Sequence, residues 1–240
     1  SIRYFNRLGL VAEADPAFDF CLIPGFRVPE WMKGAVIYQI YVDRFCRGNA
    51  RTDVQTGEFC YLAGRQSEHC EDWAEMPHPW DVNRFYGGDL PGVLEHLDEL
   101  KSLGVEALYF NPLFVSPSNH KYDTQDYDHI DPHLTVIPED EGRLLSPAEA
   151  DNRNAERYRK RTTDPVNLEA SDAYFAHFIE EAHRRGIRVI MDGVFNHCGS
   201  FHKWMNREQL YRAENGYAEG AFSSANSPYR EYIRFGADGR

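Results

Sequence analysis

The stretch Ile187-Arg-Val-Ile-Met-Asp-Gly-Val-Phe-Asn-His-Cys-Gly199 starts apolar and ends in a polar cluster. Its run 189–191 has the composition of a short strand that is covered on both faces. Asp192, Asn196 and His197 fall at or just beyond the end of that strand. Polar groups at the carboxyl ends of parallel strands line the ligand sites of α/β folds. The stretch therefore predicts an α/β fold with part of its site here.

Two further strands are predicted upstream, and a helix lies between them. Segments 35–43 and 105–111 are rich in β-branched and aromatic residues, which favours strands. Leucine and valine recur at helical spacing over 90–103, with Asp89 as the N-cap and Gly104 after the last turn. A strand, a helix and a strand with a short turn between the last two predict a parallel βαβ unit.

The chain between the second and third strands contains an expected insertion and a second helix. Residues 132–170 have the polar composition of an insertion, and Ser146 to Glu149 have the spacing of a capping box, which predicts the start of a charged helix. A second amphipathic helix is expected from Ser171, its cap, to Gly186. The basic residues of the insertion are expected to form a solvated face: Arg153, Arg157, Arg159, Lys160 and Arg161.

Polar and aromatic residues follow all three predicted strands, at segments 41–44, 111–128 and 192–197. Because the strands are parallel, these loops should converge on one rim, as in a barrel active site. A tyrosine such as Tyr122 can stack on a sugar, and histidines can donate hydrogen bonds to its hydroxyl groups. A single aspartate or histidine at a strand end is more often structural than catalytic. The prediction of an active site therefore rests on the convergence of the three loops. On the residues alone, Asp192 is the candidate catalytic carboxylate.

Composition restricts the class of partner. The chain has 240 residues and a formal net charge of −12. Nucleic-acid binding needs a basic surface, so no nucleic-acid partner is expected. No apolar run is long enough to span a membrane. The cysteine count is odd, at five, and no C-x-x-C occurs, so reduced thiols and a cytoplasmic location are expected. An extracellular location stays open for a chain that has lost a signal peptide.

Several motifs, in the same order along the chain, resemble the α-amylase family of glycoside hydrolases. Asp192-Gly-Val-Phe-Asn-His197 resembles its first conserved motif, and Ala35-Val-Ile-Tyr-Gln-Ile-Tyr-Val-Asp-Arg-Phe45 its first barrel strand. The remaining motifs are similar to the neopullulanase, cyclomaltodextrinase and maltogenic-amylase branch: Phe85-Tyr-Gly-Gly-Asp-Leu90, Leu108-Tyr-Phe-Asn-Pro112 and Ser118-Asn-His-Lys-Tyr-Asp-Thr124.

The resemblance implies a partial (β/α)8 TIM barrel, of which this chain supplies the first three strands and two helices. It implies three regions: 1–34 as a linker or the tail of a preceding domain, 35–197 as the first part of the barrel, and 198–240 as the start of a loop-rich domain inserted after the third strand. The expected substrates are α-glucans such as starch, pullulan or cyclodextrins, cleaved with retention at α-1,4 bonds and, as a second bond type, at α-1,6 bonds.

The resemblance also assigns roles to single residues. Tyr122 would stack on the sugar at the cleaved position, and His197 would bond its hydroxymethyl group. Asp192 and Asn196 would support the site, and His120 would line the same pocket. The nucleophile and the acid of the retaining mechanism come from later strands of the family's barrel, so we expect both after Arg240 and no catalytic carboxylate within the chain.

A calcium site is implied as well. Asn49, Asp53, the Gly87 carbonyl and Asp89 fall at the positions of the ligands in this branch, and oxygen ligands suit Ca²⁺. Arg47 and Thr52 stand where an asparagine is expected, and the positive charge of Arg47 repels a cation.

Three strands cannot close a barrel, so the isolated chain should expose strand edges. We expect it to lack hydrolase activity and to be unstable unless homo-oligomers rescue it. A non-catalytic carbohydrate-binding or partner subunit derived from the same fold is the alternative function. The retained Tyr122, His120 and His197 favour an enzyme.

Overall fold

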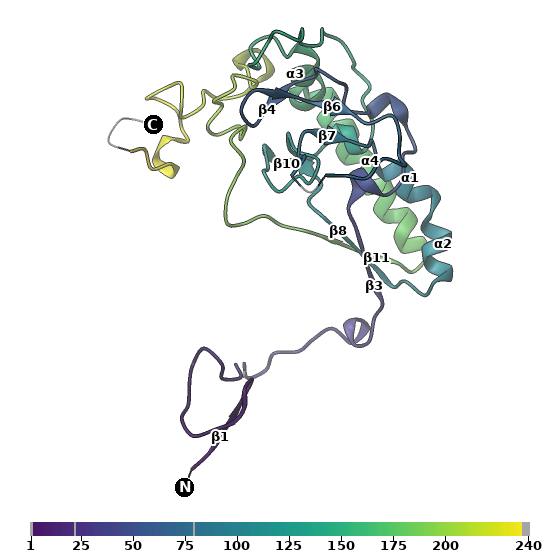
Figure 1. Ribbon diagram of the computed structural model, residues 1–240, viewed down its shortest axis with the longest axis vertical. Coiled ribbons are helices and arrows are strands. Elements are labelled where there is room, and N and C mark those ends of the chain that lie inside the picture. The colour runs from purple at the N-terminus through teal and green to yellow at the C-terminus, as the bar shows by residue number, and fades with distance from the viewer. Residues whose placement is uncertain (1, 22, 79, 237–240) are drawn as a thin grey trace. The chain divides into compact units, whose positions relative to one another are not determined.

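Three parallel strands form the central sheet. β8 (Ala107–Phe110) lies between β3 (Ile37–Ile40) and β11 (Arg188–Met191), and the last residues of all three strands are in register. Their carboxyl ends therefore meet at one edge, as the strand and βαβ predictions require (Figure 1). The structure is a computed structural model that describes residues 2–21, 23–78 and 80–236.

The outer strands are less buried than their composition suggested. Segment 189–191 was expected to be covered on both faces, but all three residues are only partly buried. Ile37 and Tyr38 of β3 are exposed to 44% and 40%. In contrast, Ala107, Leu108 and Phe110 of the central strand are fully buried.

The helix expected over 90–103 is interrupted at His96. α1 (Leu90–Glu95) and α2 (Leu97–Ser102) meet there, because the backbone of His96 leaves the helical region (φ −99°, ψ 3°). Asp89 caps α1 as predicted, since its carboxylate accepts the Gly92 N–H. Gly104 follows α2 at a positive φ of 85°, a conformation that favours glycine at a helix end.

The second long helix begins earlier than its predicted cap. α4 (Pro165–Arg184) has Asp164 as its N-cap and a proline in its first turn. Ser171 lies inside the helix, and its hydroxyl bonds Thr135 and the Ile130 carbonyl instead. The predicted cap at Ser171 was therefore wrong, whereas the predicted end at Gly186 is correct, with a positive φ of 70°.

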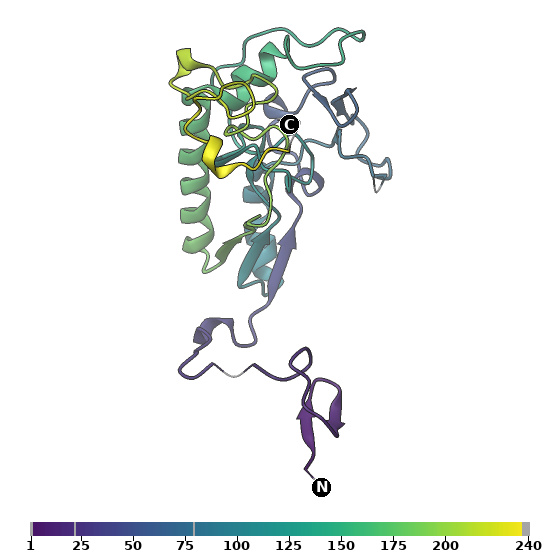
Figure 2. The same cartoon turned by 90° about the vertical axis from the view of Figure 1, so that its left-hand side faces the viewer.

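The helices cover the sheet through one apolar core. α4 contacts β11 and α1, and Figures 1 and 2 show the helices beside the strands. The buried side chains come from β3, β8, α1, α2 and α4 and from the residue before β11: Ile40, Leu90, Val93, Leu97, Leu100, Leu108, Phe110, Phe175, Phe178, Ala182 and Ile187.

A second core joins the long loop 46–86 to the insertion and to the residues after β11. Phe59, Tyr158 and Phe201 pack against one another, with a ring-centroid distance of 4.2 Å between Phe59 and Tyr158. α3 (Glu156–Thr163) carries Tyr158. The charged helix expected from Ser146 does not start there, because Ser146 to Glu149 form a turn. Two short strand pairs lie within the loop 46–86: β4 (Cys60–Tyr61) with β5 (Arg65–Gln66), and β6 (Glu68–His69) with β7 (Arg84–Phe85). A further pair, β9 (Phe114–Val115) with β10 (Asp126–Ile130), lies in the loop after β8.

The chain divides into two units, 1–35 and 36–240. The first contains a small antiparallel hairpin of β1 (Tyr4–Asn6) and β2 (Gly9–Val11), in the region predicted to be a linker or domain tail. Six 3₁₀ helices complete the described structure: Glu30–Met32, Val42–Arg44, Ala50–Thr52, Pro132–Leu134, Ala213–Asn215 and Arg230–Tyr232.

Residues 198–236 contain turns and two of these 3₁₀ helices, in the region expected to be loop-rich.

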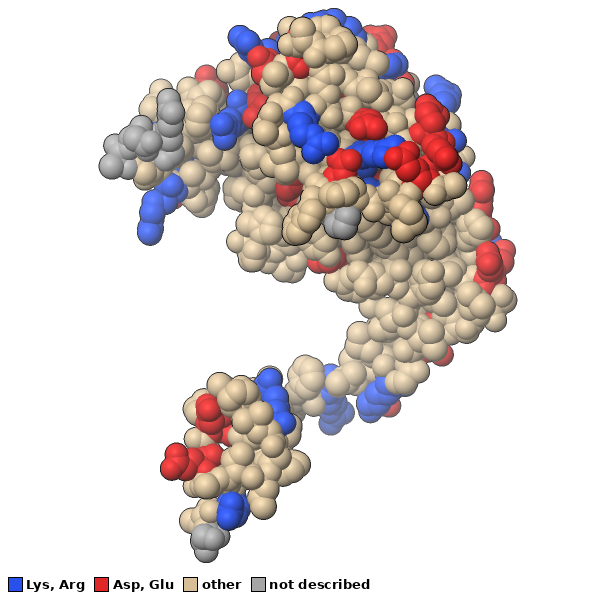
Figure 3. Space-filling model, in the orientation of Figure 1, with Lys and Arg blue, Asp and Glu red and all other residues tan. Residues whose placement is uncertain are grey.

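Acidic and basic side chains lie next to one another on the face drawn in Figure 3. Among the described helices, none has the length and apolar character needed to cross a membrane.

Candidate functional site

Tyr122 and Asp192 meet at the carboxyl edge of the sheet. Tyr122 lies in the loop after β8, and its hydroxyl donates to Asp192 Oδ2 at 2.8 Å. Asp192 directly follows β11. Burial and this carboxylate raise the pKa of Tyr122 to about 12, so its hydroxyl stays protonated at neutral pH. The two residues join the second and third strand ends, as the predicted convergence requires.

His197 lies beside the same tyrosine. Its Nε2 is 3.0 Å from the Tyr122 carbonyl oxygen, and its Nδ1 is 2.6 Å from Asn196 Nδ2. Both His197 and Asn196 are exposed, so they can meet a ligand. Tyr127, which the sequence analysis did not single out, holds this loop. Its hydroxyl lies 2.6 Å from the His197 carbonyl and 2.7 Å from the Val194 carbonyl.

His120 forms a further wall of the cluster. Its ring centroid is 5.9 Å from that of Tyr122. Its Nδ1 accepts the Tyr122 N–H at 3.1 Å, which leaves the other ring nitrogen for the proton. Burial lowers the pKa of His120, with Asp123 opposing the shift, so the neutral ring is favoured.

The first strand joins the others through side-chain amides. The Gln39 amide donates to Asn111 Oδ1 at 2.8 Å, and the Tyr41 hydroxyl donates to Asn119 Oδ1 at 2.7 Å. Asn119 in turn donates to the Asp81 and Arg84 carbonyls. The structure therefore brings all three predicted loops together, and all five predicted sugar-site residues lie in the second and third of them.

Asp43 fixes the Gly-Gly-Asp turn (Gly87-Gly88-Asp89) to the end of β3. Its buried carboxylate accepts the N–H groups of Tyr86 and Gly87 and pairs with Arg44 at 2.8 Å. Burial raises the pKa of Asp43, and Arg44 opposes that shift. Gly88 is required here, because a Cβ at this position would lie 1.9 Å from the Val42 carbonyl oxygen.

A buried charge network supports the loop that carries Tyr122, and it was not predicted from the sequence. Lys121, at a positive φ of 60°, reaches Asp131 Oδ2 at 2.7 Å. Asp131 Oδ1 is 2.8 Å from His133 Nδ1, and His133 Nε2 is 2.8 Å from Glu58 Oε1. Burial alone would raise the pKa of Asp131, but Lys121 and His133 hold it well below its usual range.

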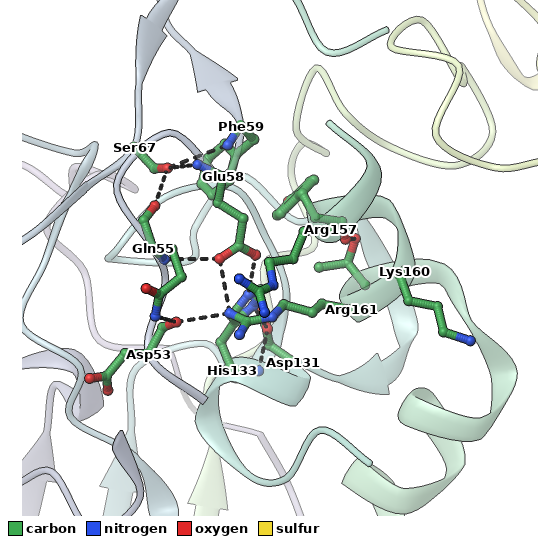
Figure 4. Close-up of polar contacts among 12 residues, drawn as sticks. Asp53, Gln55, Glu58, Phe59, Ser67, Asp131, His133, Arg157, Lys160 and Arg161 are labelled. Carbon is green, nitrogen blue, oxygen red and sulfur yellow. Dashed lines mark hydrogen bonds and ion pairs between the residues drawn. The ribbon is translucent and has the colours of Figure 1, made fainter. Parts of the chain in front are cut away.

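Arg161 carries the network into the insertion. Its Nη1 is 2.9 Å from Glu58 Oε2, and its Nε is 2.8 Å from Asp140 Oδ1 (Figure 4). Arg161 is only 1% exposed, so placing it on a solvated face was wrong. The basic cluster is divided, because Arg153 is exposed and pairs only with nearby Asp151. Glu58, which lies 103 residues from Arg161 in the sequence, provides the buried carboxylate that makes Arg161 the buried member of the cluster.

The four expected calcium ligands do not form a calcium site in this structure. Both oxygens of Asp89 accept backbone N–H groups, from Gly48, Gly92 and Asn49. Asn49 uses its side-chain oxygen to cap the Ala50–Thr52 turn. Ca²⁺ takes six to eight oxygen ligands, and these residues leave too few. Among the described residues, no group of three or more His, Cys, Asp or Glu side chains is arranged to hold a metal ion.

Comparison with known proteins decides the family. The family model described as "Alpha amylase, catalytic domain" matches residues 39–149 and 170–236. The chain belongs to the alpha-amylase family. That family has a TIM-barrel fold, and the matched residues include all five site residues named above. The gap between the matched segments, 150–169, falls within the expected insertion.

Three relatives illustrate the match. Neopullulanase 2 of Thermoactinomyces vulgaris is 37% identical over 201 residues, covering 82% of this chain and 26% of that protein. The type III pullulan hydrolase of Thermococcus kodakarensis is 29% identical with a TM-score of 0.59, covering 89% and 30%. The cyclic α-maltosyl-(1→6)-maltose hydrolase of Arthrobacter globiformis, in complex with maltose, is 28% identical with a TM-score of 0.54, covering 86% and 33%. The chain spans about a quarter of the length of the first of these.

Proposed function

We propose that this chain forms the sugar-binding start of the catalytic domain of a retaining α-glucan hydrolase or transglycosylase. The cluster of Tyr122, Asp192 and His197 at the carboxyl edge of a parallel sheet carries the proposal. In (β/α)8 enzymes the active site lies at this edge. A tyrosine, a neutral histidine and an exposed histidine can together hold a neutral, hydroxyl-rich ligand.

Within this proposal each residue has a distinct task. The ring of Tyr122 stacks on the glucose unit at the cleaved bond, and Asp192 fixes that ring through its hydroxyl. His197 contacts the hydroxymethyl group of the same sugar, and the Tyr122 carbonyl and the Asn196 amide set the orientation of the His197 ring. His120 supplies its second ring nitrogen to the pocket wall.

A retaining glycosidase uses a nucleophilic carboxylate and a carboxylic acid about 5 Å apart on opposite sides of the bond. The carboxylates near Tyr122 do not fit these roles. Asp192 is engaged by the Tyr122 hydroxyl, and buried Asp123 accepts hydrogen bonds from the Ser116 and Ser118 hydroxyls. We therefore place the nucleophile and the acid outside residues 1–240, in other strands of the same domain.

The substrate class follows from the relatives. Their names describe hydrolysis of pullulan and of a cyclic maltosyl-maltose. We propose α-1,4-linked glucans as substrates of this protein, with α-1,6 bonds as a second bond type. Hydrolysis and transfer share the covalent intermediate and differ only in whether water or a sugar accepts the glucosyl group.

The test uses a protein that contains this chain within a complete alpha-amylase catalytic domain. It is assayed on starch, pullulan and cyclodextrins, and the anomeric form of the first product is read by NMR. Turnover with an α-anomeric product supports the proposal. Absence of turnover on every glucan, together with retained maltose binding, would instead indicate a non-catalytic carbohydrate-binding protein.

A further inference from the structure

Three segments meet around the buried carboxylate of Asp53. Asp53 follows the Ala50–Thr52 turn and is 5% exposed. Its Oδ2 lies 3.1 Å from Arg47 Nη1 and 3.6 Å from His69 Nε2. A Cβ added to Gly87 would lie 2.4 Å from Asp53 Oδ1 and 3.3 Å from Arg47 Cδ. The loop after β3, the β6 strand and the Gly-Gly-Asp turn are therefore in direct contact here.

A buried carboxylate needs a compensating positive charge, because its removal from water is costly. Burial raises the pKa of Asp53, while His69 and Arg47 lower it and Asp89 raises it further. Arg47 is a permanent cation, whereas His69 is charged only when protonated. The guanidinium also lies 3.5 Å from His69 Nε2, so it contacts both groups at once.

All but one of the side-chain oxygen atoms of Asp89, Asn49 and Asp53 already have a hydrogen-bond partner. Asp89 accepts three backbone N–H groups and Asn49 accepts the Arg51 N–H. Asp53 Oδ1 is the one side-chain oxygen of these three residues without a hydrogen-bond partner in the described structure. A divalent cation at this oxygen would sit next to the Arg47 guanidinium and be repelled by it.

We propose that Arg47 takes the place of a bound metal cation in this loop. Its guanidinium joins the loop after β3 to the Gly-Gly-Asp turn through Asp53, and the loop folds without calcium. The inference rests on the contacts of Asp53 and does not depend on the proposed sugar site.

The test compares the melting temperature of the purified protein in excess EDTA and in excess CaCl2, together with equilibrium dialysis of calcium. The expected result is the same melting temperature in both and no stoichiometric calcium. A calcium ion bound at one per chain, with a higher melting temperature, would overturn the proposal.

Substitutions separate the charge of Arg47 from its bulk. Arg47→Met should lower the melting temperature by about 5 °C, and Arg47→Lys should restore most of that loss because it keeps the charge. Arg51→Met, in the same loop with an exposed side chain, is the matched control and should leave the melting temperature unchanged. Equal effects of Arg47→Met and Arg47→Lys, or no effect of either, would contradict the role of the guanidinium.

Discussion

At the scale of single residues, Tyr122 has two separable functions. Its hydroxyl fixes the ring against Asp192, while the ring itself offers the face on which we propose a sugar stacks. The backbone of the same residue meets His197 and His120. Tyr122 thus connects every residue of the candidate sugar site, through its side chain or its backbone, except Asn196, which reaches it through His197.

Substitution of Tyr122 should separate the two functions. Tyr122→Phe removes one hydrogen bond to a carboxylate and keeps the ring, so kcat/KM should fall about tenfold. Tyr122→Ala removes both and should reduce kcat/KM at least 100-fold, because stacking is lost as well. Steady-state kinetics on maltotriose measure both. Tyr217→Phe, which removes a hydroxyl bonded elsewhere to the Thr163 carbonyl, is the control. Equal losses in Tyr122→Phe and Tyr122→Ala would argue against stacking.

His133 has an acceptor oxygen at each ring nitrogen. Ionised carboxylates only accept hydrogen bonds, so both nitrogens must donate, and the ring is an imidazolium. Burial on its own would lower the pKa of His133, but Glu58 and Asp131 raise it above its usual value. The other charges around these carboxylates are Arg161 and Lys121, and both carboxylates have lowered pKa values.

A pH dependence follows from His133. Because its pKa is raised in the folded state, its stabilisation is fully present below about pH 6.5 and is lost as pH rises through the folded-state pKa. The free energy of unfolding in urea should therefore fall in the wild type as pH rises above about 6.5. His133→Gln should reduce that fall, whereas His183→Gln, at an exposed position, should not. The same pH slope in wild type and His133→Gln would contradict the imidazolium assignment.

At the scale of elements, α3 is attached to the protein by the core packing of Tyr158 and by the buried ion pairs of Arg161. Arg161 pairs with Glu58 and Asp140 and donates to the Asp53 carbonyl, so it joins the insertion to the loop after β3. The Lys121 end of the same network lies next to Tyr122. The insertion is therefore connected through buried charges to the loop that carries the candidate site.

Arg161→Met should lower the free energy of unfolding by about 3–5 kcal/mol, since it leaves Glu58 buried with one partner fewer. Arg153→Met should change it by less than about 0.5 kcal/mol, because the Arg153–Asp151 pair is exposed. Urea titration of both variants measures the difference. A small effect of Arg161→Met, similar to that of Arg153→Met, would show that the network adds little to stability.

The strands were easier to predict than the helix boundaries. The strands β3 and β8 and the start of α1 follow from residues within those elements, namely strand-forming residues and the Asp89 cap, and the structure confirms all three. Ser171 and Asp164 are both acceptable caps by residue type, and only the tertiary bonds of Ser171 to Thr135 and Ile130 exclude it. The Ser146 N–H donates to the Glu149 carboxylate, as in a capping box, but the two residues close a turn, so the motif predicted this local bond and not the helix.

At the scale of the whole molecule, motif order predicted more than residue chemistry did. It predicted the family and the residues at the carboxyl edge, which the structure brings together. It did not predict the buried network, because partners such as Glu58 and Arg161 lie far apart in the sequence and have no local signature. The expected calcium ligands were placed by position alone, whereas in the fold the side-chain oxygens of Asp89 and Asn49 accept backbone N–H groups and Asp53 pairs with Arg47.

Hydrolysis of 4-nitrophenyl α-maltoside by purified 1–240 tests whether the catalytic carboxylates lie outside this chain, with a complete alpha-amylase catalytic domain containing the chain as the positive control. We expect 1–240 to release nitrophenol no faster than buffer, while the complete domain turns the substrate over and loses that activity with Tyr122→Ala. Release by monomeric 1–240 that Asp192→Asn abolishes would show the opposite, because it would make Asp192 the catalytic carboxylate.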